Sequence, residues 1–344
     1  MSIDLQMAYI YTVINGHPYP PLYDCSNRTT EEWYATGSEE WPLGIYFLVT
    51  GVLLEVIAIL YLPCLATMWK LNLLTSSCYK IMFFLGCLDM SSVFVNSIMT
   101  GYFAIRGAVF CTNPLTLLSL GAFGCACWCA SCFTCILLAL NRCADLSESS
   151  FLKMIFDGNR VFFLLFLSLL YLLFIMFLTT PASFNSNYVS WFFNPMTGQE
   201  SLSYVNVYHA VNNVIVAFTT TFLYFYLCLK LYFKTKKSTS KVGRFQKQIF
   251  IQSFLICLIN VLAAYIYVYM QYFAPPKWLV IIGQIAWQLS AGFVCVIYLT
   301  VNRTIRRGVI DLLVPMKYVG RVHAKLAPTT RASDNRTHSD AHLT

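Results

Sequence analysis

The sequence predicts an all-α membrane protein built as a seven-transmembrane helix bundle. Apolar residues make up 58% of the chain and charged residues only 11%, a balance typical of α-helical membrane proteins rather than of soluble domains. Seven apolar stretches are each about as long as the roughly 20 residues that a helix needs to cross a bilayer. Because seven is odd, the two ends of the chain are expected on opposite sides of the membrane. The stretches cover residues 43–68, 80–104, 115–140, 161–180, 205–233, 249–273 and 278–301.

The basic residues give this bundle an expected orientation. With the N-terminal segment outside, the outer segments carry only Arg28, Arg106 and Lys277, and the inner segments carry the other 20 of the 23 Lys and Arg residues. Positive charge gathers on the cytoplasmic loops of membrane proteins. The sequence therefore predicts an N-terminus outside the cell and a C-terminus in the cytosol. This bias accounts for the net charge of +8, so nucleic acid is not an expected partner.

The segment before the first stretch is expected to form an extracellular tail, residues 1–42, that is too short for a core of its own. It lacks the basic start of a cleaved signal peptide and includes Asp4, so the first helix is expected to serve as an uncleaved signal-anchor. Asn27 begins an Asn-Arg-Thr acceptor for N-glycosylation on the outer side. Similar acceptors at Asn302 and Asn335 fall on the cytosolic side and are expected to stay unmodified.

The distribution of apolar and charged residues divides the rest of the chain into a bundle, an amphipathic helix and a tail. The bundle covers residues 43–301, and residues 302–315 are predicted to form an amphipathic helix on the inner membrane surface. Apolar residues recur there at helical spacing, opposite Arg306 and Arg307. Residues 316–344, rich in Thr, Ser, Asp and Arg, are predicted to be a disordered cytoplasmic tail.

Charged and strongly polar residues within the apolar stretches are candidates for function, because polarity is costly inside a membrane. Asp89 lies in the second stretch, and Asn141 and Arg142 end the third stretch at its cytosolic side. An alternative for Asp89 is a protonated carboxyl that holds helices together. An alternative for Arg142 is an anchor whose charged head reaches the membrane interface.

These residues stand in patterns that resemble rhodopsin-like G-protein-coupled receptors. Residues 85–89 (Leu-Gly-Cys-Leu-Asp) match the second-helix pattern L-x-x-x-D, and residues 141–143 (Asn-Arg-Cys) stand where such receptors have the D-R-Y-type end of helix 3. Residues 298–306, which begin with Tyr298, are similar to the helix-7 end of nematode serpentine chemoreceptors, and most similar to the Srt class. The Tyr-x-Cys pattern of residues 23–25 fits the same class.

The resemblance implies a chemosensory receptor without enzymatic activity and without a cofactor. A small-molecule or peptide ligand would switch the seven-helix bundle between two states, and one state would activate a heterotrimeric G protein. Such a receptor is expected in the plasma membrane of a sensory cell. The residues expected to carry the switch and the G-protein contact are Arg142, Asn141, Tyr298 and Asp89.

Three features depart from the general receptor pattern. Asn141 replaces the acid that normally precedes the helix-3 arginine, which leaves Asp145 or Glu148 as a candidate partner for Arg142. The sixth stretch has no proline, and the seventh lacks N-P-x-x-Y and retains only Tyr298. The activation steps of other receptors are therefore not carried over to this chain.

Most of the 14 cysteines lie inside the apolar stretches, where packing between helices is the preferred explanation and a metal site is the alternative. Only Cys25 and Cys111 are clearly placed outside, in the oxidising compartment. The usual receptor disulfide ends in the second outer loop, which has no cysteine here. We expect instead a Cys25–Cys111 disulfide that ties the tail over the mouth of the bundle.

A ligand of a helical bundle binds between helices, where apolar walls carry a few polar groups. Leu117, Leu120 and Gly121 are expected to form the wall from helix 3, and the aromatic run 191–193 is a candidate lid. Each polar candidate has the alternative of an interhelical hydrogen bond. The absence of Lys and Arg in the outer half argues against a strongly anionic ligand. The pocket candidates are His209, Asn212, Asn213, Tyr265, Tyr269, Gln284, Trp287 and Gln288.

A seven-helix transporter or a ligand-gated channel is the alternative to a receptor. A transporter is disfavoured because no segment of the chain repeats convincingly, and an inverted, channel-forming receptor is disfavoured by the charge bias. An enzyme is the least expected class. No metal-ligand set, nucleophile–base pair or pair of carboxylates is expected to face an aqueous compartment.

Overall fold

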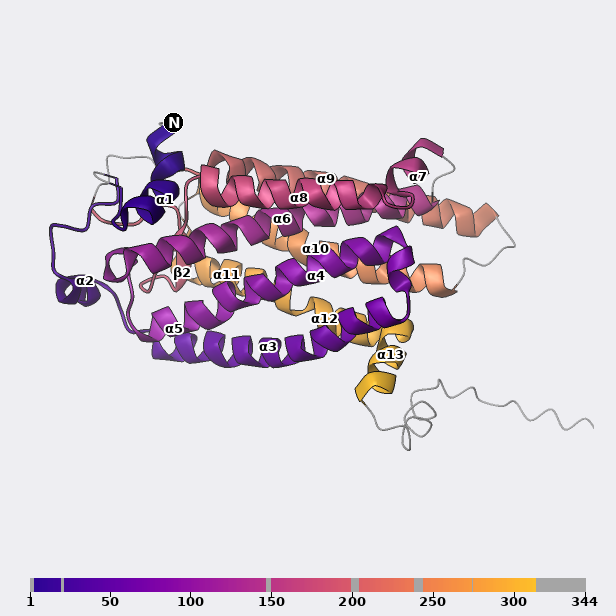
Figure 1. Cartoon of the computed structure of the whole chain (residues 1–344), viewed down its shortest axis with the longest axis horizontal. Helices are drawn as coiled ribbons and strands as arrows, with labels where there is room; N and C mark the ends of the chain where they lie inside the picture. Colours follow the sequence, from indigo (N-terminus) through magenta and orange to yellow (C-terminus); the bar gives the residue numbers. More distant parts are fainter. Residues whose placement is uncertain are drawn as a thin grey trace, which may run out of the picture.

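The computed structural model is a bundle of long helices that lie side by side, with short elements at both ends (Figure 1). It describes residues 3–19, 22–146, 150–198, 204–237, 244–273 and 275–313. The α-helices are α1 (Ile3–Asn15), α2 (Thr30–Thr36), α3 (Trp41–Lys70), α4 (Ser77–Val93), α5 (Thr100–Ile105), α6 (Pro114–Leu146), α7 (Ser150–Phe156), α8 (Arg160–Leu178), α9 (Val207–Lys237), α10 (Arg244–Tyr272), α11 (Lys277–Gly292), α12 (Val294–Val301) and α13 (Arg303–Leu313). The shorter elements are the 3-10 helices η1 (Leu73–Thr75) and η3 (Phe110–Thr112), the π-helix η2 (Phe94–Met99) and the strands β1 (Ser183–Asn185) and β2 (Ser190–Phe192).

The long helices make seven passes along the bundle within the described residues. The second pass joins α4, η2 and α5, and the seventh joins α11 and α12. Five passes each contain a helix that is long and apolar enough by itself to cross a membrane. The first pass has side chains that are described only in part, and the seventh is divided at Phe293. The passes follow the seven apolar stretches, with extra turns where α6, α9 and α10 continue into polar sequence.

Helix α6 is the centre of the bundle. It packs against α4, α8, α9 and α10. Its cysteines are buried at these contacts, where small side chains let neighbouring helices approach closely. In the described part of the chain, no group of His, Cys, Asp or Glu is arranged to hold a metal ion. The buried cysteines of α6 are Cys125, Cys127, Cys129, Cys132, Cys135 and Cys143.

The peripheral helices expose large apolar side chains along their length. On α8, Phe162, Phe166, Leu170 and Leu173 recur at helical spacing on the exposed face. Helix α9 exposes a second row at Ile215, Phe218, Phe222 and Phe225. Soluble proteins rarely expose apolar bands of this extent. These faces are therefore the surface that meets lipid.

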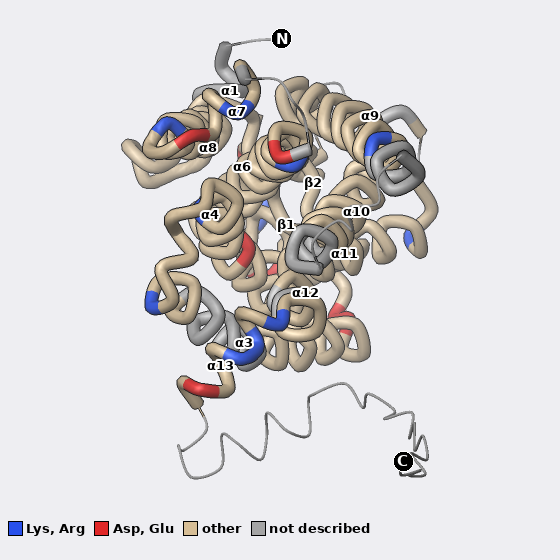
Figure 2. Tube along the Cα trace, turned by 90° about the vertical axis from the view of Figure 1, so that its right-hand side faces the viewer, with Lys and Arg blue, Asp and Glu red and all other residues tan. Residues whose placement is uncertain are grey.

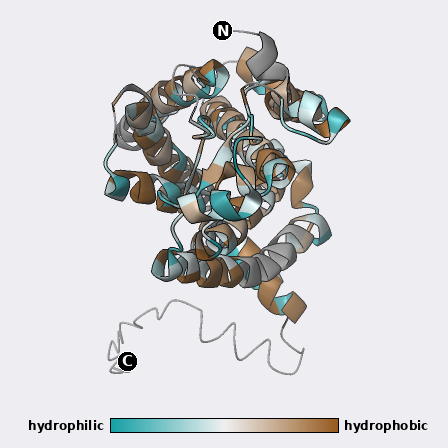
Figure 3. Cartoon of the chain, turned by 90° about the vertical axis from the view of Figure 1, so that its left-hand side faces the viewer, coloured by the Kyte–Doolittle hydropathy of each residue, from teal (hydrophilic) through white to brown (hydrophobic). Residues whose placement is uncertain are grey.

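The two ends of the bundle differ in structure and charge. The hairpin end carries α2, η3 and the antiparallel pair β1–β2, in which Phe184 lies opposite Trp191. The basic end carries η1, α7 and α13. Figure 2 views the basic end and shows Lys and Arg at the ends of several helices. Figure 3 views the hairpin end, where hydrophilic residues colour the connecting segments and hydrophobic residues colour much of the long helices.

The N-terminal segment packs onto the hairpin end. Its Tyr23 and Trp33 are buried in one cluster with residues of η3 and α6. Cys25 and Cys111 form a disulfide with their Cα atoms 5.5 Å apart. Helix α1 lies against α8 and α6. The segment was expected to have no core of its own, and its aromatic residues instead extend the core of the bundle.

Helix α13 begins at the end of the seventh pass. Asn302 caps it, because its Oδ1 accepts from the backbone N–H groups of the first turn, including that of Ile305 at 3.1 Å. Its Nδ2 donates to the Tyr79 hydroxyl at 3.1 Å. Ile305 and Val309 are buried, and α13 packs against α3. The predicted disordered tail, residues 316–344, lies outside the described residues.

Candidate functional site

A cavity of about 240 Å³ lies at the hairpin end of the bundle. Helices α6, α9, α10 and α11 form its sides, and β2 with its neighbouring residues forms the cover. Most of the lining side chains are aromatic or aliphatic, and the described lining residues include no Asp, Glu, Lys or Arg. They are Gly121, Cys125, Trp128, Ala182, Trp191, Phe192, Phe193, His209, Tyr267, Met270, Pro275, Gln284 and Trp287.

The hairpin lies directly against α6 at Gly121. A Cβ atom at this position would lie 1.9 Å from the backbone oxygen of Ala182 and would collide with it. Only glycine therefore lets the chain before β1 approach α6 this closely. The contact fixes the cover of the cavity to its central helix.

Gln284 of α11 joins the hairpin to the second pass. Its Oε1 accepts from Ser190 Oγ at 3.1 Å, and its Nε2 donates to the backbone oxygen of Asn96 at 2.9 Å and to Thr100 Oγ1 at 3.3 Å. Thr100 Oγ1 also accepts from Trp191 Nε1 at 2.9 Å. Asn96 belongs to the π-helical turn η2, a kind of turn that is frequent at functional sites. The amide of Gln284 is thus held by three elements at once.

His209 and Asn213 of α9 form a second polar group beside the aromatic wall. The His209 ring lies edge-on to Phe193, with centroids 5.1 Å apart, and to Tyr267, with centroids 6.0 Å apart. Asn213 Oδ1 accepts from Trp128 Nε1 at 2.8 Å, and Asn213 Nδ2 lies 3.4 Å from the His209 ring nitrogens. These contacts hold the aromatic side chains of three helices in place.

Among the pocket candidates from the sequence, His209, Gln284 and Trp287 line the cavity. Gly121 lines it as well, whereas Leu117 and Leu120 do not. The remaining amide candidates are buried and make hydrogen bonds between helices, which was the alternative for each. Asn212 Oδ1 accepts from Tyr171 of α8, Asn213 pairs with Trp128 of α6, and Gln288 donates to Thr50 of α3 and Ser97 of η2.

Tyr265 and Tyr269 do not line the cavity. Their side chains are 39% and 45% exposed on the outer face of α10, and Tyr267 lines the cavity in their place. Side chains two residues apart on an α-helix point about 200° apart, so alternate tyrosines fall on opposite faces. A membrane helix is apolar on both faces. For this reason the sequence pattern did not reveal which tyrosines of α10 face the interior of the bundle. Trp128, Tyr267 and Met270 were missed because neither a charge nor an amide group distinguishes them within an apolar run.

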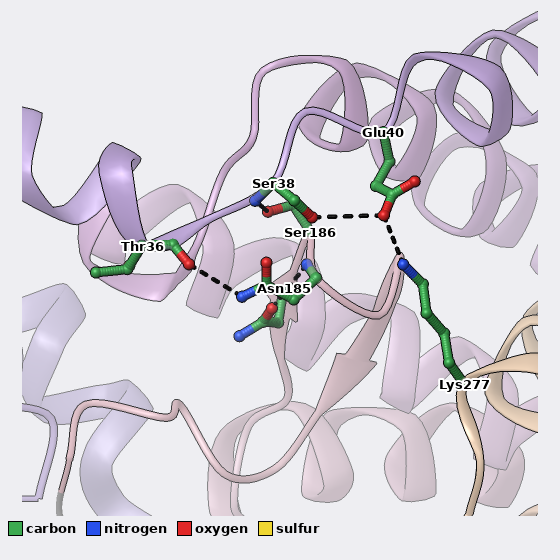
Figure 4. A network of polar contacts seen from close by, with 7 residues as sticks. Thr36, Ser38, Glu40, Asn185, Ser186 and Lys277 are labelled. Carbon is green, nitrogen blue, oxygen red and sulfur yellow. Dashed lines mark hydrogen bonds and ion pairs between the residues drawn. The ribbon is translucent and has the colours of Figure 1, made fainter.

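A polar network at the rim of the hairpin end ties three chain segments together (Figure 4). Lys277 Nζ, in the first turn of α11, pairs with Glu40 Oε1 just before α3 at 2.5 Å. The backbone N–H of Ser38 donates to Ser186 Oγ in the hairpin connection at 3.2 Å. The hairpin, the N-terminal segment and the seventh pass are therefore linked at the rim as well as inside the bundle.

A second candidate site lies around Arg142 at the basic end. Its side chain is buried, with Nη1 2.9 Å from Asp145 Oδ2 and Nη2 donating to Asn141 Oδ1 at 2.5 Å. Asn141 Nδ2 donates to Ser77 Oγ of α4 at 2.8 Å. Asp145, one turn further along α6, thus supplies the acid that is missing before Arg142. Glu148, the other candidate partner, lies outside the described residues.

Asp89 does not line the cavity. Asp89 is buried on α4, and its Oδ2 has no hydrogen-bond partner among the described residues. The same holds for Ser131 Oγ of α6. Tyr298 belongs to α12, and its side chain is outside the described part of the structure.

Comparison with known protein families shows to which family the chain belongs. Residues 7–321 match the model of the family described as serpentine type 7TM GPCR chemoreceptor Srt. The chain belongs to the Srt family of chemoreceptors. A relative, the serpentine receptor class T-55 of Caenorhabditis elegans, is 28% identical to this Srt chain over 312 residues, which cover 90% of the chain and 84% of the relative.

Membership of the Srt family makes the chain a multi-pass membrane protein of a receptor family. The resemblance found in the sequence is confirmed, as is the seven-transmembrane helix bundle. The matched region includes the cavity, the hairpin and Arg142. Both candidate sites therefore lie within the part of the chain that the family shares.

Proposed function

We propose that this Srt chemoreceptor binds a small molecule in the cavity beneath the hairpin and activates a heterotrimeric G protein at the basic end. The cavity carries the proposal, because it combines an aromatic wall with a few fixed polar groups, as ligand sites in helical bundles do. Its volume of about 240 Å³ favours a small molecule over a peptide.

The hairpin end faces outside the cell in this proposal, and the receptor lies in the plasma membrane of a sensory cell. The gathering of Lys and Arg at the opposite end supports this orientation. The Cys25–Cys111 disulfide also supports it, since disulfides persist in oxidising compartments. Asn27 is exposed at the same end and is proposed to carry a glycan.

Coupling at the basic end is assigned to Arg142 and Asn141, with Asp89 and Tyr298 as further switch residues along the passes. Asn141 bonds to Ser77 and so joins α6 to α4, while Arg142 is buried beside it. A ligand that binds one arrangement of the passes more tightly shifts the population toward that arrangement. The G protein binds the arrangement in which this end is open, and the two binding events are then reciprocally coupled.

The test is expression of the whole chain in cells with a G-protein readout, screened against volatile and water-soluble small molecules. At least one compound should evoke a saturable response that disappears when the G protein is inhibited. A ligand-evoked current that persists without the G protein would contradict the coupling and favour a channel. A compound that binds the purified chain without any G-protein response would contradict the coupling alone.

A further inference from the structure

We propose that a second pocket at the hairpin end binds small organic carboxylates, and that the guanidinium group of Arg28 receives the carboxylate. The pocket has a volume of about 500 Å³, and its walls come from three segments, residues 28–36, 109–111 and 185–198. It shares no lining residue with the cavity beneath the hairpin. The inference therefore goes beyond the proposed function and does not depend on it.

Bonds between the three segments hold the pocket in shape. Trp33 forms part of its wall and is buried, and the Trp33 Nε1 donates to the backbone oxygen of Cys25 at 3.2 Å. The disulfide joins Cys25 to Cys111 of the second segment. Asn187 Nδ2 of the third segment donates to the backbone oxygen of Thr36 at 3.0 Å. The walls are thus fixed before a ligand binds, which lowers the entropy cost of binding.

Arg28 supplies the positive charge of this pocket. Its Cζ lies 5.0 Å from the ring centroid of Trp33 in a cation–π contact. The ion pairs found among the described residues do not involve Arg28. A guanidinium group in a cation–π contact is still able to bind a carboxylate through two parallel N–H···O bonds. A ligand carboxylate is therefore the group that Arg28 suits best.

The acids of the N-terminal segment do not supply this partner. The described residues that line the pocket include no Asp or Glu. Asp24 and Glu32 accept from backbone N–H groups at 2.9 Å and 2.8 Å, and Glu40 pairs with Lys277. A cationic ligand would find no carboxylate on the described wall. The charge of the wall thus favours an anion.

The other lining residues indicate the body of the ligand. Phe110 and Tyr188 add aromatic surface, and the side chains of Asn185 and Asn187 add amide groups. The volume of the pocket lies within the range of about 300–1,000 Å³ that is typical of small-molecule sites. A carboxylate whose uncharged body combines an aromatic ring with an amide matches this wall. Hippurate is such a molecule and provides the probe.

The experiment measures the binding of hippurate to the purified full-length chain in a non-ionic detergent, by ligand-observed NMR titration. Hippuramide is the neutral counterpart, and N-benzoylethylenediamine is the cationic one. At low ionic strength hippurate should bind about tenfold more tightly than either counterpart. This preference should shrink as salt is added, because salt screens an exposed ion pair.

Two arginine variants test the position of the charge. Arg28→Gln should remove the preference for hippurate, and it keeps the N-glycosylation acceptor that begins at Asn27. Arg106→Gln is the matched control and should leave the preference unchanged. Arg106 is an exposed arginine of the same end whose Cζ lies 5.9 Å from the ring centroid of Tyr34, but it does not line the pocket. The melting temperatures of both variants show whether they fold.

Four results would overturn the inference. They are a counterpart that binds as tightly as hippurate, a preference that survives in Arg28→Gln, an equal loss of preference in both variants, and no saturable binding of hippurate. An equal loss in both variants would mean that the general charge of this end attracts the anion, rather than a site at Arg28. Hippurate binding without a G-protein response would uphold the inference and leave the proposed function to its own test.

Discussion

Trp191 of the hairpin donates its indole N–H to Thr100 of the second membrane pass over 2.9 Å. The same hydroxyl accepts from Gln284 of the seventh pass at 3.3 Å. One threonine therefore joins the cover of the cavity to two passes of the bundle. A ligand in the cavity would touch both Trp191 and Gln284. This junction is the route by which we propose that occupancy of the cavity reaches the helices.

Loss of this junction should weaken the agonist response. Trp191→Phe removes the donor and Thr100→Val removes the acceptor with little change in shape, and each should raise the half-maximal agonist concentration about five- to tenfold, the effect of one buried hydrogen bond. Dose–response curves in the G-protein assay measure this. Trp41→Phe, at an exposed tryptophan of the same end, is the control. Unchanged potency in both variants would argue against the junction.

The Cys25–Cys111 disulfide should contribute strongly to stability. It closes a loop with a sequence separation of 86 residues, and removal of such a bond typically costs about 2–5 kcal/mol. Cys25→Ser and Cys111→Ser should each lower the melting temperature of the purified chain, by similar amounts. Cys228→Ser, at an exposed free thiol on α9, should not lower it. Peptide mapping that found Cys25 and Cys111 both free in surface protein would rule the bond out.

Arg142 should matter far more than its ion-pair partner. Arg142→Ala should abolish the agonist response while the amount of receptor at the cell surface persists, because the buried guanidinium is proposed to contact the G protein. Asp145→Asn should reduce potency less than Arg142→Ala does, since Asp145 is half exposed and Asn141 Oδ1 also accepts from Arg142. Surface labelling and the G-protein assay separate these effects. A full response in Arg142→Ala would remove the role assigned to it.

Asn27 should carry the glycan, and Asn302 should not. Asn27→Gln should remove a mobility shift that a glycosidase also removes, whereas Asn302→Gln should leave the glycan intact. Thr29 has a double role, because its side chain also caps α2 by accepting from the backbone N–H of Glu32. Thr29→Ser should keep both the glycan and the cap. A glycan that survived Asn27→Gln would contradict the orientation proposed for the chain.

The helices and their order could be predicted from the sequence, because each pass is a long apolar run with polar flanks. The hairpin could not, since β1 and β2 have only three residues each and their pairing depends on contacts with α6 and α11. The position of the N-terminal segment was predicted in part. The Cys25–Cys111 disulfide was expected to tie it over the mouth of the bundle, whereas the burial of Tyr23 and Trp33 in a core shared with the bundle was not predicted.

The site was predicted in part. Polar residues such as His209 and Gln284 stand out in an apolar run, and both line the cavity. Tyr265 and Tyr269 were selected on the same grounds, but they face outward, because lipid accepts aromatic side chains as readily as a bundle interior does. The partner of Arg142 was narrowed to two acids from the sequence, and geometry places Asp145 beside it.

The central claim, that the ligand binds in the cavity beneath the hairpin, is tested most directly by comparing Tyr267→Ala with Tyr269→Ala. Both tyrosines lie on α10, but Tyr267 lines the cavity and Tyr269 is exposed on the opposite face. Agonist affinity, measured by direct binding to the purified chain, should fall about tenfold or more in Tyr267→Ala and stay unchanged in Tyr269→Ala. Equal affinities in the two variants would contradict the account.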